Sequence, residues 1–412
     1  MSRLCRSVGR TLLCLLSWLL IASKLWADFQ LVDVIKEFGE KRYVETGPTR
    51  IKAGPAQFHP TLRSKVQYDD NILLEDRDGR EDVIYEVLPG AIVDLPINKH
   101  RVTVGYEADM EFFSKERQRT QNDQNQNFFT LFNFHFPSWY VNVLERFSET
   151  SGRAGTTFTS RIPRIDQSIH PKIGYRWKRL IFEAGYKHSV RDFRRQIDDG
   201  LDFQINEWTG VIFYDLFANL KALVEYQVAQ IDYDDASARK GTFNQARLGL
   251  EGEVLPNLVL KVRLGPHFRD YRVSTEKDYQ SWVGEFRAEY QFRQNLKYHV
   301  EMTKKAVEAT FGNVNFYKQH LIQTGIEYRI RPQWEIFTLG RFFRQSYAER
   351  AAVGDRSGFR RDHNMSVKTG IRFEPRDWLE FELAYEHYRR LSNFDTFDYG
   401  DNRFSLSSAL VY

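Results

Sequence analysis

The chain has only two cysteines among its 412 residues, and both lie near its start. Cys5 and Cys14 fall in a segment with a basic beginning, a short apolar stretch over 12–22 and small residues before Ala27. This layout is typical of a secretory signal peptide, with an uncleaved anchor as the alternative. We expect residues 1–27 to be removed. The remaining chain then has no thiol, which excludes a disulfide framework and a cysteine-ligated metal site.

Long apolar runs are also lacking, because the segment over 12–22 is the one continuously apolar stretch. This excludes a membrane protein built from several helices. The net charge of +4 belongs to the signal as well: four of the 59 bases leave with it and no acid does, so 55 bases face 55 acids. A chain with equal numbers of bases and acids lacks the excess positive charge that is typical of nucleic-acid-binding proteins.

Motifs for catalysis are missing too. The ten histidines are scattered without metal-ligand spacing, and the sequence has no glycine-rich phosphate loop or nucleophile elbow. We expect no enzyme activity, no catalytic or metal site and no cofactor.

Alternating polarity is the dominant pattern that is present. In "RVTVGYEADMEF" (101–112) apolar residues occupy one face and charged residues mostly the other, and "LVLKVRLG" (258–265) repeats this order. A period of two indicates strands with one apolar face.

Turns fall into two classes that alternate along the chain. Short ones near 96–98, 137–138, 178–179, 217–219, 256–257, 294–295, 331–333 and 375–377 recur about every 40 residues. Longer polar segments lie between them: 72–81, 114–125, 147–163, 192–202, 233–242, 270–279, 307–315, 347–362 and 391–399. Short turns on one side and long loops on the other are typical of outer-membrane barrels, with the short side in the periplasm.

The sequence therefore predicts an all-β fold: a transmembrane, antiparallel, up-and-down β-barrel of about 18 strands (16–18) over residues 58–412, in the bacterial outer membrane. Residues 28–57 are expected to form a periplasmic segment with a short helix or a plug. Aromatic girdles are expected at both interfaces. The periplasmic girdle would contain Trp139, Trp177, Trp334 and Trp378, and the outer one Phe112, Phe147, Phe193 and Tyr347.

Charges of both signs fall on the face opposite the apolar residues and are expected to face the lumen. They form either cross-strand ladders that stiffen the wall or a transverse field that orients a solute. The expected set is Arg63, Lys65, Arg101, Glu107, Asp109, Lys172, Arg176, Lys261, Arg263, Glu285, Arg287, Lys368, Arg372, Glu380 and Glu382. Four aromatic residues also fall inward, as a sugar-stacking track or as plug contacts: Phe129, Phe213, Phe337 and Phe343.

Two short motifs stand at the ends of the predicted barrel. Asp69, Asp70 and Asn71 follow the first strand, where they either cap the first-loop turn or bind Ca²⁺ with oxygen atoms from a neighbouring loop. The final strand ends in an aromatic residue and is interpreted either as an assembly signal, read by the barrel-assembly machinery, or as an ordinary strand. Its apolar face comprises Phe404, Leu406, Leu410 and Tyr412.

The first strands carry a family resemblance. Gly54-Pro55, Pro60, "YDDNI" (68–72) and "DVIYEVLPG" (82–90) resemble the porin 2-like family of outer-membrane β-barrels, which is often associated with exopolysaccharide export. The resemblance implies an outer-membrane conduit for a polysaccharide, with outer-membrane lipid and periplasmic polysaccharide-export components as partners and no nucleic acid. The alternatives are a general diffusion porin for small polar solutes, an outer-membrane enzyme or a structural barrel.

Overall fold

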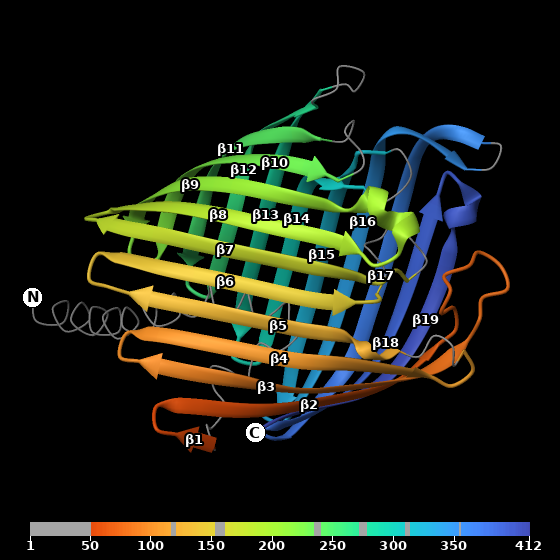
Figure 1. Cartoon of the computed structure of the whole chain (residues 1–412). Coiled ribbons are helices and arrows are strands. Elements are labelled where there is room, and N and C mark those ends of the chain that lie inside the picture. Colours follow the sequence, from red (N-terminus) through yellow and green to blue (C-terminus); the bar gives the residue numbers. More distant parts are fainter. Residues whose placement is uncertain are drawn as a thin grey trace, which may run out of the picture.

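The computed structural model describes residues 51–116, 121–152, 161–234, 240–271, 278–309, 314–353 and 356–412. Strands β2 to β19 pair in chain order, each antiparallel to the next, and β19 pairs with β2 to close the sheet. The result is an 18-stranded up-and-down barrel (Figure 1). The predicted fold class is confirmed.

The strands are long enough to cross a bilayer when tilted, which takes about 9–11 residues. Their bounds are β2 Ala56–Asp69, β3 Asp82–Ile97, β4 His100–Phe113, β5 Gln121–His135, β6 Trp139–Thr150, β7 Arg164–Trp177, β8 Leu180–Phe193, β9 Phe203–Phe217, β10 Leu220–Tyr233, β11 Gly241–Leu255, β12 Leu258–Tyr271, β13 Tyr279–Arg293, β14 Leu296–Glu308, β15 Phe316–Arg331, β16 Trp334–Val353, β17 Arg356–Arg376, β18 Leu379–Ser392 and β19 Tyr399–Val411. Two short 3₁₀ helices, η2 (Gln196–Leu201) and η4 (Asp395–Phe397), lie in the long loops.

The alternating sequence separates the two faces of the wall. On β2, Leu62, Val66 and Tyr68 are exposed on the outside, whereas Arg63 and Lys65 between them make ion pairs on the inside. Among the described residues, no helix is both long and apolar enough to cross a membrane. Closed antiparallel barrels with an apolar exterior satisfy every backbone group in lipid and are built into bacterial outer membranes. The chain is therefore an outer-membrane protein, as the sequence predicts.

The short turns of the sequence are the hairpin turns of the barrel. Asn98, Lys178 and Asn257 adopt positive φ angles of 55°, 54° and 67°. Two-residue hairpin turns favour this left-handed conformation because it matches the twist of the strands. Since these turns share one end of the barrel, the long loops all lie at the other, extracellular end.

Two strand boundaries differ from the sequence-based expectation. The predicted loop 347–362 is largely a β-hairpin, because β16 continues to Val353 and β17 begins at Arg356. The predicted N-terminal segment 28–57 includes β1 (Ile51–Ala53), which pairs with the start of β2. The expected helix or plug over 28–50 and the signal peptide lie outside the described residues.

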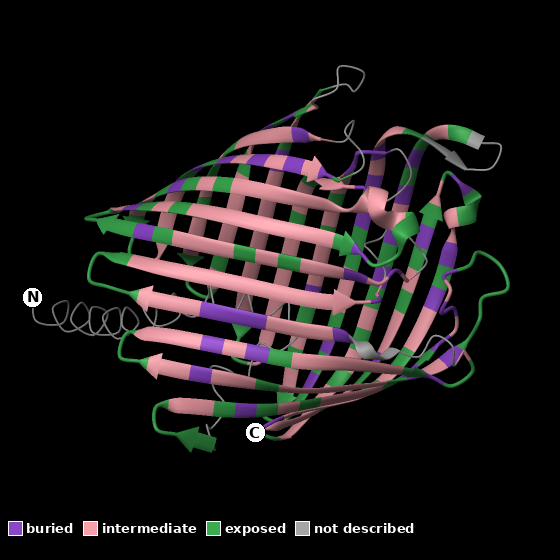
Figure 2. Cartoon of the chain, in the orientation of Figure 1, coloured by how far each residue is buried: buried purple, intermediate pink, exposed green. Residues whose placement is uncertain are grey.

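Small apolar clusters cover the inner wall at the extracellular end. Phe193 packs on Ile162, and Tyr347 packs with Tyr317, with only 2% and 3% of Phe193 and Tyr347 exposed. The expectation that Phe193 and Tyr347 belong to an outer aromatic girdle is therefore wrong. Their strands continue beyond the bilayer, where inward aromatic rings pack beneath the loops. Figure 2 shows further buried residues toward the loop ends of β17, β18 and β19.

Candidate functional site

The candidate site is the inner wall of the barrel, defined here as the face opposite the exposed apolar side chains. Alternation along the strands puts all fifteen predicted charged residues on this wall, and the ion pairs described below bring fourteen of them to partners of opposite charge. Asp109 on β4 is the remaining one, and its Oδ1 has no hydrogen-bond donor among the residues that the structure describes.

A first ladder of charges crosses β10 to β13. Its centre is Glu225, 2% exposed, which accepts hydrogen bonds from Arg247 (Nε, 2.7 Å) and Arg263 (Nη1, 2.5 Å). Arg263 also reaches Glu251 at 2.9 Å. Lys261 extends the ladder to Glu285 on β13 at 3.0 Å. Charges therefore alternate in sign around this part of the wall.

A second ladder crosses β16 to β18. Arg372 contacts three carboxylates: Glu335 at 2.5 Å, Glu382 at 3.1 Å and Glu380 at 3.4 Å. Lys368 adds a second cation 2.8 Å from Glu382. Three acids thus share two bases.

The remaining predicted residues form smaller groups around the wall. On β2 to β4, Arg63 donates to Glu107 (Nε, 3.0 Å) and Lys65 lies 3.0 Å from Glu86. The other pairs are Arg101 with Asp94 at 2.7 Å, Lys172 with Glu183 at 3.3 Å, Arg176 with Asp215 at 2.7 Å and Arg287 with Glu301 at 3.5 Å.

Sequence reasoning missed several central partners. Four of them lie between apolar or small residues in an alternating segment: Glu225, Arg247, Glu335 and Asp94. The period of two in the sequence therefore already indicates that these residues face inward. What alternation does not provide is the choice of partner, because that depends on which strands lie side by side and in what register.

Two of the four inward aromatic rings lie against glycines on the neighbouring strand. Phe129 pairs directly with Gly105, and Phe337 with Gly370. A Cβ built on Gly105 would lie 2.0 Å from the Phe129 ring, and one on Gly370 would lie 2.8 Å from the Phe337 ring. The free face of Phe337 is covered by the guanidinium of Arg372, 4.8 Å from the ring centroid. These rings are part of the wall's packing.

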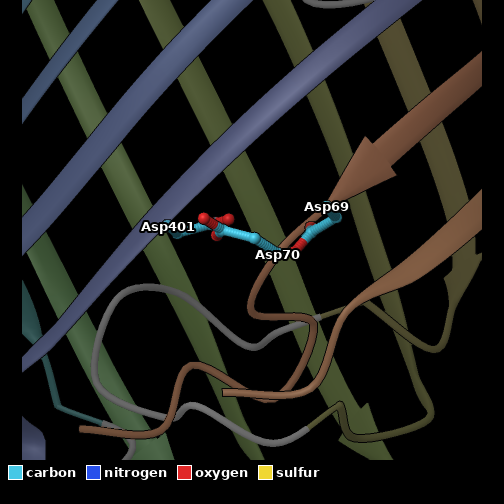
Figure 3. A group of neighbouring side chains, drawn as sticks. All are labelled: Asp69, Asp70 and Asp401. Atoms are coloured by element: carbon cyan, nitrogen blue, oxygen red, sulfur yellow. The ribbon is translucent and has the colours of Figure 1, made fainter. Parts of the chain in front are cut away.

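The first-loop turn lies beside the last strand, where the barrel closes (Figure 3). Asp69 accepts the Asn71 backbone N–H at 2.9 Å, and Asp70 accepts two hydrogen bonds from Asn402. Asp401, fully buried, brings a third carboxylate, and the three offer ligand atoms within 4.8 Å of one another. Arg403 supplies a counter-charge to Asp69 at 3.2 Å and also contacts Asp401. The calcium alternative stays a prediction.

The final strand presents the apolar face that the sequence predicts. Phe404, Leu406 and Tyr412 are 54%, 56% and 41% exposed on the outside, and Leu410 pairs with Leu62 of β2. Its role as an assembly signal stays a prediction.

No family model and no curated protein matches the chain, so the resemblance to the porin 2-like family also stays a prediction. Solved structures of similar shape include a porin, an outer-membrane protein and a siderophore receptor. A BenF-like porin from Pseudomonas fluorescens has a TM-score of 0.49 and 11% identity over 87% of this chain and 99% of its own. OccAB3 of Acinetobacter baumannii gives 0.49 and 11% over 87% and 100%, and OpdK of Pseudomonas aeruginosa with vanillate gives 0.47 and 11% over 86% and 99%.

Proposed function

We propose that the chain is a diffusion channel for small polar solutes across the outer membrane. One observation carries the proposal: the inner wall of a closed 18-stranded barrel is lined by charged residues of both signs, while its apolar residues face outward. Barrels of 16–18 strands are wide enough to hold an aqueous channel.

The paired charges suit small solutes rather than one ion. Each base of the two ladders has a carboxylate within reach, so the wall offers alternating donors and acceptors without a net field of one sign. The donors and acceptors of such a lining can take the place of the water molecules around a polar solute. Because each of these many sites binds the solute only weakly, the solute passes through rather than staying bound. Weak selectivity between small anions and cations follows.

Polysaccharide export, the expectation from the family resemblance, has less support. A sugar track needs aromatic faces open to the lumen. Phe129 and Phe337 lie against glycines, Phe343 is 4% exposed, and the Lys221 ammonium lies over Phe213 at 5.8 Å. These contacts argue against stacking as a way to conduct a glycan.

Conductance of the refolded protein in planar bilayers tests the proposal. We expect stable steps whose size grows with salt concentration and a small reversal potential in a salt gradient. Arg372→Glu should shift that potential toward cation preference, whereas Arg389→Gln, on the outward face of β18, should not. A correctly folded barrel that never conducts would contradict the channel.

A gene deletion separates the two transport hypotheses. Unchanged cell-surface polysaccharide, together with slower uptake of small polar solutes, supports the diffusion channel. Lost polysaccharide with unchanged uptake favours export and would replace our proposal.

A further inference from the structure

A row of basic side chains crosses the outside of the barrel near its extracellular end. Lys304 of β14 pairs with His320 of β15, His320 with Arg344 of β16, and Arg344 with His363 of β17. All four lie on the outward face, since each is two residues from an exposed apolar neighbour on its own strand: Met302, Ile322, Phe342 and Met365.

The next row toward the extracellular side adds two more bases. Lys318 pairs with Ser346, and Ser346 with Arg361. Lys318, His320, Arg344 and Arg361 line one open hollow of about 560 Å³ together with Lys304. We name the six bases of the two rows the outer basic patch.

The outer basic patch has little acidic counter-charge in the described parts of its own strands. The outward positions of β14 to β17 hold apolar, small, threonine or basic residues up to the patch, and Glu308, an acid in the same alternation at the end of β14, binds Arg269 and Tyr233 instead.

Lys304 and Arg344 flank His320 in the first row, and Lys318 and Arg361 flank Ser346 in the second, so four permanently cationic side chains line one hollow. Repulsion among like charges on neighbouring strands destabilises a sheet, so the patch favours the binding of an anion from outside the chain.

The position of the patch limits what that anion can be. The row of Met302, Ile322, Phe342 and Met365 lies directly below it and is 39–45% exposed, as expected of side chains that face lipid. Beside the patch, Trp282 is 53% exposed, and the Lys304 ammonium lies 3.7 Å from its ring centroid. Exposed tryptophan marks the membrane–water interface. The bases thus stand at headgroup level, above acyl-chain level.

From this geometry we infer that the outer basic patch binds the phosphate groups of an anionic glycolipid in the outer leaflet. With strands about 4.8 Å apart, four of them span roughly 14 Å, enough for a headgroup that carries more than one phosphate. The ligand's acyl chains would lie along the apolar row while the bases contact its phosphates, since Lys and Arg clusters at a membrane surface attract anionic lipid headgroups.

Binding of purified lipid A to the refolded protein in zwitterionic detergent, measured by native mass spectrometry, tests this inference. We expect saturable binding of lipid A with both phosphates. The double variant Lys304→Gln/Arg344→Gln should weaken it by about tenfold or more, because each base near a membrane surface contributes separately. Arg344→Lys should largely retain binding.

The matched control is Arg341→Gln, which removes one positive charge from the inner face of the same strand, where Arg341 donates to Gln323. It should leave lipid binding unchanged, and heat-modifiable gel migration should show that every variant folds. Three results would overturn the inference: equal binding of dephosphorylated lipid A, unchanged binding by the double variant, or displacement of the lipid by inorganic phosphate at matched phosphate concentration.

Discussion

Asp70 and Asn402 lie 332 residues apart in the chain and join its two ends. The Asp70 carboxylate accepts the backbone N–H of Asn402 at 2.7 Å with one oxygen and the Asn402 side-chain amide at 2.7 Å with the other. The register between β2 and β19 ends at the pair Asp69–Arg403, and the Asp70 backbone N–H then donates to the Asn402 carbonyl oxygen at 3.2 Å. The carboxylate therefore reinforces a further step of the closing strand pair at the start of the extracellular loops.

Asp70→Ala should destabilise the closed barrel at this strand pair. Hydrogen bonds to a charged group contribute about 1.5–3 kcal/mol each, and partial exposure to water lowers the combined loss here to about 1–3 kcal/mol. The measurement is the temperature at which the folded form disappears on heat-modifiability gels. Asp76→Ala, in the same loop and paired with the exposed Arg77, is the control and should change little. Equal behaviour of the two variants would show that Asp70 has no role in closure.

Gly105→Ala should lower stability because it removes the space for an aromatic ring. The new Cβ would lie 2.0 Å from the Phe129 side chain, so the ring has to leave its place on the wall. Overpacking of this kind costs about 1–3 kcal/mol. Urea unfolding in lipid vesicles measures the loss. Gly210→Ala is the matched control, since nothing lies within 4 Å of its added Cβ. A Gly105→Ala barrel as stable as the Gly210→Ala barrel would refute this packing role.

The strands and the inward charges follow from simple periodicity. A period of two fixes which face of its strand each residue occupies, and Lys65 and Arg372 lie on the face opposite the exposed apolar side chains, where they form ion pairs. Turn residues such as Asn98 and Asn257 mark the hairpins because few residues tolerate positive φ.

The extracellular end is harder to predict because its strands leave the membrane. Beyond the bilayer both faces of a hairpin meet water, so the apolar alternation ends although the hydrogen-bonded ladder continues. For this reason residues 347–362 have the composition of a loop but form the end of the β16–β17 hairpin. Phe193 itself lies on the same face of β8 as the inward Glu183 and packs in a small inner core with Ile162, so its aromatic character alone was a misleading sign of a girdle.

The outer basic patch was hidden for a related reason. Lys304, His320 and Arg344 occur in three separate segments of the sequence. Only the strand register puts them in one row. The sequence of each strand shows its own basic residue, but it does not show which basic residues of other strands lie next to it.

Glu225→Gln should change both stability and ion selectivity. The carboxylate is 2% exposed and neutralises Arg247 and Arg263, so its loss leaves two guanidinium groups short of counter-charge. Removal of one partner of a buried pair costs about 3–5 kcal/mol, and the cost is lower here because Arg263 keeps Glu251 at 2.9 Å. We expect the reversal potential in a salt gradient to shift toward anion preference. Glu81→Gln, which removes an acid from the external loop, should leave the selectivity nearly unchanged. If the reversal potential of Glu225→Gln shifted toward cation preference instead, this would contradict the position of the first ladder in the conducting lumen.

The loop between β8 and β9 should be held more firmly in mild acid than at neutral pH. Asp202, which follows η2, accepts the Phe193 backbone N–H at 2.7 Å. Burial, followed by repulsion from Asp192, Asp199 and Asp234, raises the pKa of Asp202 to about 6. A raised pKa means that the folded loop binds the proton more tightly than the unfolded chain does. Its contribution to stability is therefore full below about pH 4 and is lost as the pH rises through about 6.

Hydrogen exchange of this loop, corrected for intrinsic rates, should show more protection at pH 5 than at pH 7.5. Asp202→Asn should abolish the difference, whereas Asp198→Asn, which breaks the ion pair with the exposed Arg195, should keep it. A pH difference that persists in Asp202→Asn would assign the effect to another group.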